Sequence, residues 1–208
     1  MKTANRFGDF VRNIGYLGPS EPPQPLPNRG YVFPLRCSPM ILLQGFNSLP
    51  GTMHQLPGSF NGVRLLHEGI DLRCASGEEM LAAQSGTVCL CTTDPRSIYG
   101  NCIYLNHENG KSCSFYSHLD QILVREGEAL KQAQTIAKGG SSCFGRIEPG
   151  NEHLHFELRA GIFSNRGCPN DGTLPWGLPL HKLVEMNKSQ NEQERFIRYL
   201  KRLFGLRE

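Results

Sequence analysis

Two short polar runs, His67–Asp71 and His153–Glu157, constrain the fold of this chain most, because both place histidine or carboxylate side chains at even spacing. On a β-strand, residues two or four positions apart point to the same face. His153 and His155 are two apart, and on a helix that spacing would send them to nearly opposite faces. A glycine and a β-branched isoleucine within the first run also disfavour a helix. We therefore expect both runs to form strands.

These two runs contain the side chains of a possible metal site. Histidines that share a strand face with apolar neighbours are costly to bury unless their ring nitrogens have partners. Two neutral imidazoles and one carboxylate are a typical ligand set for a zinc centre that keeps one position for water. We expect one Zn²⁺ per chain, held by His67, Asp71 and His155. For any one of these histidines alone, the simpler alternative is a hydrogen-bonded core residue.

Two further histidines are candidates for proton transfer next to such a metal. His118 closes a strand-like segment, and His153 shares its strand with His155. Either ring could accept a proton from water or donate a hydrogen bond to a developing oxyanion; the alternative is a polar contact at a strand edge. We expect Glu68 and Glu157 to face away from the metal and to form salt bridges.

The rest of the chain predicts a mainly antiparallel β domain between two extensions. Residues 1–30 are rich in proline and read as an extended N-terminal segment. The domain itself is expected over 31–178. A helical tail is expected over 179–208.

Several strands can be placed within the domain. The Asn-Gly pair before Lys111 suits a tight turn, so residues 102–107 and 112–118 are expected to form a hairpin. Residues 78–91 read as a strand with a break at Gly86, and a further strand is expected over 152–159.

Phe196, Ile197, Leu200, Leu203 and Phe204 form the apolar stripe of an amphipathic helix in the tail, among basic residues. Such a stripe packs on the domain or on a partner. A basic helix that contacts an anionic surface is the alternative.

Composition excludes some classes of protein. The net charge of +3 over 208 residues does not indicate a nucleic-acid-binding protein. No run approaches the roughly 20 apolar residues of a transmembrane helix. The first ten residues contain no apolar stretch of signal-peptide length. The eight cysteines are compatible with buried thiols or with disulfides, and Cys89 and Cys91 are expected to share a strand face.

An ordered series of motifs resembles the lysostaphin/LytM-type zinc metalloendopeptidases, which cut peptide bonds in bacterial peptidoglycan. The series covers about residues 45–159 and comprises Gly45-Phe46, His67-Glu-Gly-Ile-Asp71-Leu, Gly77, Ala82-Ala83, Gly86-Thr-Val88, Tyr99-Gly-Asn101, Leu105-x-His107-x-x-Gly110, Tyr116-Ser-His118-Leu119, Val124-x-x-Gly127 and His153-Leu-His-Phe-Glu-Leu-Arg159. Each motif is weak alone, whereas the whole series in this order is specific.

The resemblance implies a compact antiparallel, sandwich-like β domain with an active-site groove. It implies His67, Asp71 and His155 as zinc ligands, and His118 and His153 as catalytic residues that do not bind the metal. The expected activity is hydrolysis of a peptide bond in the stem or cross-bridge of peptidoglycan, which places the protein at the cell envelope or outside the cell. The segment 139–150 is bulkier than the glycine-rich loop that is usual in the family.

Two alternatives stay open. Some proteins with this resemblance do not cut but activate cell-wall amidases. Another zinc peptidase, such as a D-Ala-D-Ala peptidase, could share the architecture.

Overall fold

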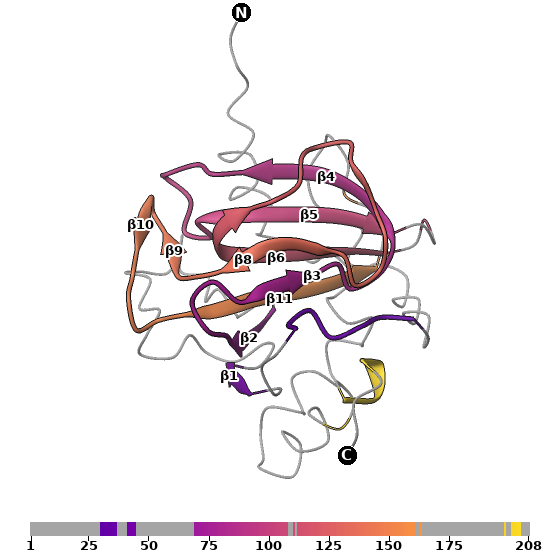
Figure 1. Cartoon of the computed structure of the whole chain (residues 1–208), viewed down its shortest axis with the longest axis horizontal. Helices are drawn as coiled ribbons and strands as arrows, with labels where there is room; N and C mark the ends of the chain where they lie inside the picture. Colours follow the sequence, from indigo (N-terminus) through magenta and orange to yellow (C-terminus); the bar gives the residue numbers. More distant parts are fainter. Residues whose placement is uncertain are drawn as a thin grey trace, which may run out of the picture.

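The structure, a computed structural model, describes residues 30–36, 41–44, 69–107, 110, 112–160, 163, 198 and 201–204. Over these residues the fold is mainly antiparallel β, as predicted (Figure 1). Helix within this part of the chain is confined to residue 198 and residues 201–203. None of it is long and apolar enough to cross a membrane.

The main sheet runs in the order β1-β2-β11-β6-β5-β4-β7, and every pair in it is antiparallel. The strand bounds are β1 Leu42–Gln44, β2 Ile70–Arg73, β3 Glu79–Leu81, β4 Gly86–Thr92, β5 Asn101–His107, β6 Ser112–Ile122, β7 Ala129–Leu130, β8 Thr135–Gly139, β9 Ser142–Cys143, β10 Arg146–Ile147 and β11 His153–Ala160.

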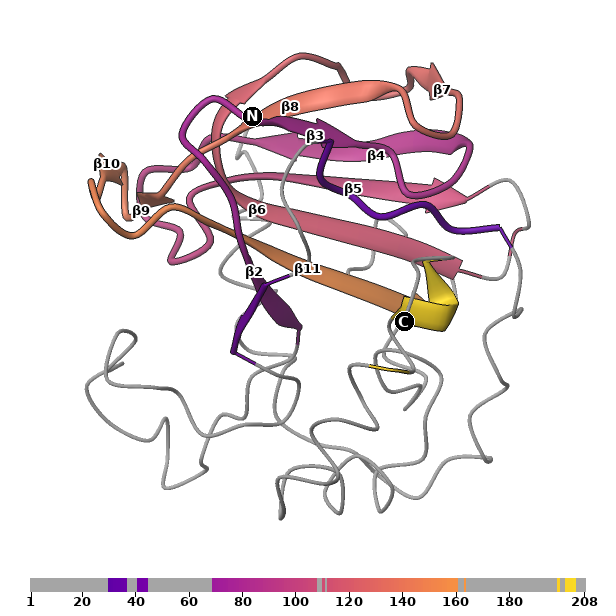
Figure 2. The ribbon, with the colours of Figure 1, turned by 60° about the horizontal axis from the view of Figure 1, so that its bottom comes forward.

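Strand β6 connects two parts of the fold. Its first half pairs with β5 and β11, and its second half pairs with β8, which in turn pairs with β3. The β3–β8 pair therefore lies against one face of the main sheet (Figures 1 and 2). The short β9–β10 hairpin follows β8 and occupies the segment that is bulkier than expected for the family.

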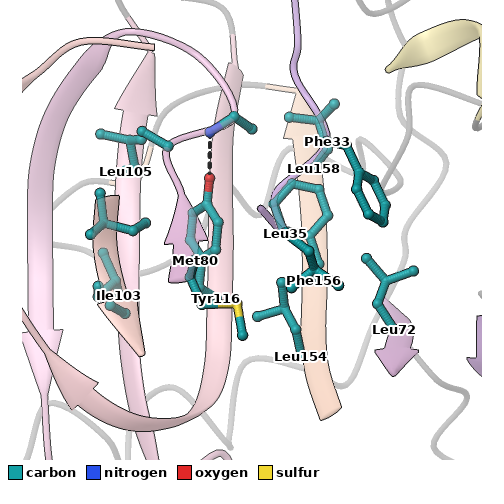
Figure 3. Packing of buried hydrophobic residues seen from close by; sticks show 14 of the residues in the cluster. Phe33, Leu35, Leu72, Met80, Ile103, Leu105, Tyr116, Leu154, Phe156 and Leu158 are labelled. Atoms are coloured by element: carbon teal, nitrogen blue, oxygen red, sulfur yellow. Dashed lines mark hydrogen bonds between the residues drawn. The ribbon is translucent and has the colours of Figure 1, made fainter. Parts of the chain in front are cut away.

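The main core fills the space between the sheet and β3. Strand β11 alternates strictly, with Leu154, Phe156 and Leu158 fully buried in this core (Figure 3). The phenol of Tyr116 on β6 accepts a hydrogen bond of 2.8 Å from the backbone N–H of Ala83. This bond satisfies a buried donor and fixes the core against the segment after β3. The intervening residues of β11, among them both histidines, face the opposite side of the sheet.

Most of the predicted strands are confirmed. The hairpin corresponds to β5 and β6, and the late strand to β11. The segment 78–91 contains two strands instead of one, since β3 ends at Leu81 and β4 begins at Gly86.

The prediction that Cys89 and Cys91 share a face is wrong. Cys91 packs on the main core, whereas Cys89 packs on a separate cluster formed by Cys102, Tyr104 and Phe115. The register of β4 against β5 shifts between Val88 and Leu90, and such a bulge interrupts the two-residue alternation. The six cysteines in the described residues are free thiols: Cys74, Cys89, Cys91, Cys102, Cys113 and Cys143.

Segments from both ends of the chain reach the core. Tyr31, Phe33 and Leu35 are buried in it, and so are Leu203 and Phe204 from the predicted tail. The ring of Phe204 lies 5.6 Å from that of Phe33, between centroids. The described part of the amphipathic stripe thus packs on the domain. The first 29 residues lie outside the described residues, and the domain boundaries stay a prediction.

His107, at the end of β5, predicts a pH dependence of stability. Its side chain is buried against Tyr31, and neither ring nitrogen forms a hydrogen bond within the described part of the chain. Burial lowers the pKa of His107 from 6.5 to about 4. The backbone groups of Ser85 and Gln84 raise this pKa, but by less than burial lowers it. Neither backbone group forms a well-aligned bond with the ring, so burial decides the protonation state.

We expect the free energy of unfolding to fall as the pH drops from 6.5 towards 4. In this window the unfolded chain takes up a proton at His107 that the folded protein excludes. The loss attributable to this group between pH 7.5 and 4.5 is about 2–3 kcal/mol. Urea unfolding of the wild type and His107→Phe at both pH values measures it. Equal pH dependence in the two proteins would contradict the prediction.

Candidate active site

The pairing of β2 with β11 brings Asp71 of the first polar run to His155 of the second. Asp71 stands directly opposite His155 in the register, so both side chains lie on the same face of the sheet. Asp71 Oδ1 is 3.0 Å from His155 Nδ1, and the two side chains are only 5% and 6% exposed. A carboxylate and an imidazole that are distant in the sequence thus converge in a buried place.

This pair fits zinc. Carboxylate oxygen and imidazole nitrogen are both common zinc ligands, and two ligand atoms on a tetrahedral zinc lie about 3.3 Å from each other. The observed 3.0 Å separation between Oδ1 and Nδ1 is close to that value. The third expected ligand, His67, lies outside the described residues, as does Glu68. Within the described residues alone, there is no group of three or more His, Cys, Asp or Glu side chains that could hold a metal ion.

The second nitrogen of His155 also has a carboxylate partner. Its Nε2 lies 3.0 Å from Oε1 of Glu157, and Oε2 of Glu157 accepts a hydrogen bond from Arg159 Nε at 2.5 Å. Burial alone lowers the pKa of His155, but hydrogen bonds to Asp71 and Glu157 raise it to about 9. The metal-free ring is therefore an imidazolium between two carboxylates, and a metal at Nδ1 would displace one proton.

The prediction for Glu157 is wrong in part. Glu157 does form a salt bridge, with Arg159, but its side chain does not face away from the candidate metal ligand. It is two residues after His155, and the strand alternation puts both on one face. The two-residue alternation that places His153 and His155 on one face also applies to Glu157. The sequence could therefore have predicted that Glu157 lies beside His155.

His118 reaches the site through an unusual backbone conformation. Ser117 pairs with His155, so strict alternation would turn the next residue to the core face of β6. The φ angle of His118 is +62°, in the left-handed region that few non-glycine residues adopt. As a result its ring lies 4.4 Å from that of His153 and 6.2 Å from that of His155, between centroids. Backbone outliers of this kind concentrate at functional sites.

Hydrogen bonds to backbone carbonyls orient both accessory histidines. Nδ1–H of His118 donates to the carbonyl oxygen of Ser142, in β9, at 2.8 Å. Nδ1–H of His153 donates to that of Asn151 at 2.7 Å. In each ring the other nitrogen, Nε2, is then the basic one in the neutral form. Burial, followed by the neighbouring His153 and His155, holds the pKa of His118 well below 6.5, so His118 is neutral at pH 7.

Gly69 permits the close approach of β2 and His155. A Cβ at this position would lie 2.7 Å from both His155 Nε2 and the carbonyl oxygen of Phe156. The backbone oxygen cannot move away without disturbing β11. The absence of a side chain here is thus a geometric requirement of the site.

We expect Gly69→Ala to displace the His155 ring, weaken zinc binding by roughly tenfold or more, and destabilise the fold by about 1–3 kcal/mol. Zinc competition with a chromophoric chelator and thermal unfolding measure the two effects. Gly77→Asn is the control, because its φ of +75° suits asparagine and nothing lies within 4 Å of an added Cβ. Unchanged zinc affinity in Gly69→Ala would show that the ring tolerates a Cβ.

Aromatic rings continue from the polar cluster across the same face of the sheet. Tyr99 lies 5.9 Å from His155 and 5.3 Å from Phe115, between ring centroids. Tyr104 stacks on Phe115 at 4.3 Å and on Phe163 at 4.5 Å. Tyr99 was part of a motif in the sequence, but its proximity to His155 depends on the packing of the loop after β4.

Comparison with known proteins agrees with this architecture. Residues 65–167 match the model of peptidase family M23. A zinc-containing peptidase from Vibrio cholerae is similar in structure, with a TM-score of 0.54 and 25% identity over 73% of this chain and 40% of that one. The chain thus contains a peptidase family M23 domain, and the predicted resemblance to lysostaphin-type proteins is confirmed.

Curated relatives have longer chains. The Lipoprotein NlpD/LppB homolog of Pseudomonas aeruginosa is 38% identical over 104 residues, which are 50% of this chain and 33% of that protein. The Murein hydrolase activator NlpD of Escherichia coli is 36% identical over 93 residues, 45% of this chain and 23% of that protein. The chain therefore spans about a third or less of the length of these two relatives.

Proposed function

We propose that this chain is a zinc-dependent peptidase that hydrolyses peptide bonds in the stem or cross-bridge of peptidoglycan. The observation that carries the proposal is the convergence of Asp71 and His155, 3.0 Å apart and buried, with His118 and His153 beside them. Zinc bound there, with His67 as the third ligand, would supply Lewis acidity to a scissile carbonyl and to a water molecule.

The residues around that position have separate roles in the proposed reaction. Asp71 and His155 would hold the metal. His118 is neutral at pH 7 and oriented by the Ser142 carbonyl, so its Nε2 can accept a proton from the attacking water. His153, whose ring contacts that of His118, is placed to share the proton or to donate a hydrogen bond to the developing oxyanion.

A second candidate function is activation of cell-wall amidases without cleavage. The observation that favours it is the relatives' names, since the Escherichia coli relative is called a murein hydrolase activator. The comparisons with curated proteins support this role better than they support cleavage. The geometry of the described site favours the peptidase.

Digestion of purified sacculi separates the candidates. Sacculi are incubated with this chain alone, with a purified amidase alone, and with both, and the soluble products are identified by mass spectrometry. A peptidase releases fragments with new internal peptide termini by itself, and zinc restores this release after the chelator-treated chain has been dialysed. An activator releases nothing alone but accelerates the amidase. Release of single terminal D-alanine residues would instead indicate a carboxypeptidase.

A further inference from the structure

One face of β11 carries an unbroken row of three interacting polar side chains, His155, Glu157 and Arg159. Glu157 is 1% exposed and Arg159 is 9% exposed. One carboxylate oxygen of Glu157 faces His155 Nε2 at 3.0 Å, and the other accepts from Arg159 Nε at 2.5 Å. Both oxygens of this carboxylate are thus engaged, and its orientation is fixed from two sides.

Stability does not explain this buried pair. Removing a carboxylate and a guanidinium from water costs several kcal/mol per ion, and well-packed apolar residues in their place are often as stable or more stable. The residues directly opposite on β6 are Phe115 and Cys113, beside which apolar side chains would be expected to pack well. The pair therefore calls for a role other than holding β11 to β6.

The hydrogen bond determines which nitrogen of His155 can bind a metal. A carboxylate only accepts hydrogen bonds, so the proton shared with Glu157 belongs to Nε2. Nδ1 faces the other carboxylate, with Oδ1 of Asp71 at 3.0 Å. A metal held by Asp71 would take the place of the Nδ1 proton, which leaves the lone pair of Nδ1 for the metal and the remaining proton on Nε2. Without an acceptor at Nε2, the ring could rotate about χ2 or adopt the other tautomer.

We propose that Glu157, held by Arg159, is a positioning residue that fixes the His155 ring with Nδ1 directed at the metal position beside Asp71. This role rests on the proposed zinc site. It follows the general arrangement in which a metal-bound histidine donates its second N–H to a carboxylate. Arg159 contributes through Glu157, because it fixes the carboxylate that fixes the ring.

The test is the zinc affinity of the full chain, measured by competition with a chromophoric chelator. Glu157→Leu/Arg159→Met replaces the ion pair with apolar side chains and is expected to keep or raise the melting temperature. Its zinc affinity is expected to fall 10- to 100-fold. The control pair, Glu126→Leu and Arg125→Met, changes the same residue types at exposed positions and should leave the affinity unchanged.

A second readout is ¹⁵N NMR of the His155 ring in the zinc-loaded wild type, where we expect the proton on Nε2. A folded double variant that binds zinc as tightly as the wild type would overturn the role of Glu157 while leaving the zinc site in place. A proton on Nδ1, with zinc at Nε2, would overturn it equally. Failure of the wild type to bind zinc would overturn the proposed function itself, and the positioning role with it.

Discussion

Asp71→Asn is expected to lose zinc. Asparagine keeps the size of the side chain and an oxygen that can accept the hydrogen bond from His155, so the fold should persist. It removes the negative charge that a divalent cation requires, at one of the two predicted ligands that the described structure brings together. Because changes outside the ligand shell already cost 10- to 100-fold in metal affinity, we expect a loss of more than about a hundredfold.

Zinc content after dialysis and chelator competition measure this effect. Asp120→Asn is the matched control, since Asp120 is an exposed residue near the end of β6. Under the peptidase proposal, Asp71→Asn should also release no fragments from sacculi. Full zinc occupancy in Asp71→Asn, with the ordinary affinity, would remove Asp71 from the site.

His118→Ala is expected to retain zinc and lose turnover. His118 is not one of the predicted ligands: its Nδ1–H donates to the carbonyl oxygen of Ser142, and its basic nitrogen is the proton acceptor in the proposed reaction. Loss of a positioned general base typically reduces the rate by about 10²- to 10⁴-fold. Fragment release from sacculi measures the rate. Chelator competition should show no loss of zinc affinity approaching the roughly 10- to 100-fold that is typical when a residue that positions a metal ligand is replaced.

The backbone at this position calls for a second variant. A φ of +62° strains alanine, whereas asparagine adopts the left-handed region more readily. His118→Asn should therefore retain more stability than His118→Ala while losing the same activity. Full activity in a folded His118→Asn protein would exclude His118 as the proton acceptor. Loss of zinc from both variants would instead indicate that His118 helps to hold the metal.

Much of the fold followed from local patterns. The alternation of His153 to Arg159 between polar and apolar residues required a strand with one face in the core, and the structure has that strand as β11. The turn at Gly110 required a hairpin between β5 and β6. These features depend only on neighbouring residues along the chain, which is why sequence periodicity was sufficient to predict them.

Other features depended on strand pairing. Cys89 and Cys91 lie on different faces of β4 because that strand bulges where it pairs with β5. A bulge depends on both strands of a pair, so one strand's sequence does not predict it. His118 reached its neighbours only because its backbone leaves the extended conformation where β6 exchanges its partners. Neither event has a signal in the spacing of residues along one strand.

The sequence by itself determined which side chains could form the candidate site: two histidines and an aspartate as metal ligands, and two further histidines for proton transfer. It also determined that strands carry them. Only the tertiary structure decided that Asp71 stands opposite His155 and that Asp71 and Glu157 lie at different nitrogens of the same ring. The alternation of side chains between the two faces of a strand is a local property of an extended backbone. Which residues stand opposite each other on neighbouring strands is set by hydrogen bonds and packing between segments that are distant in the sequence.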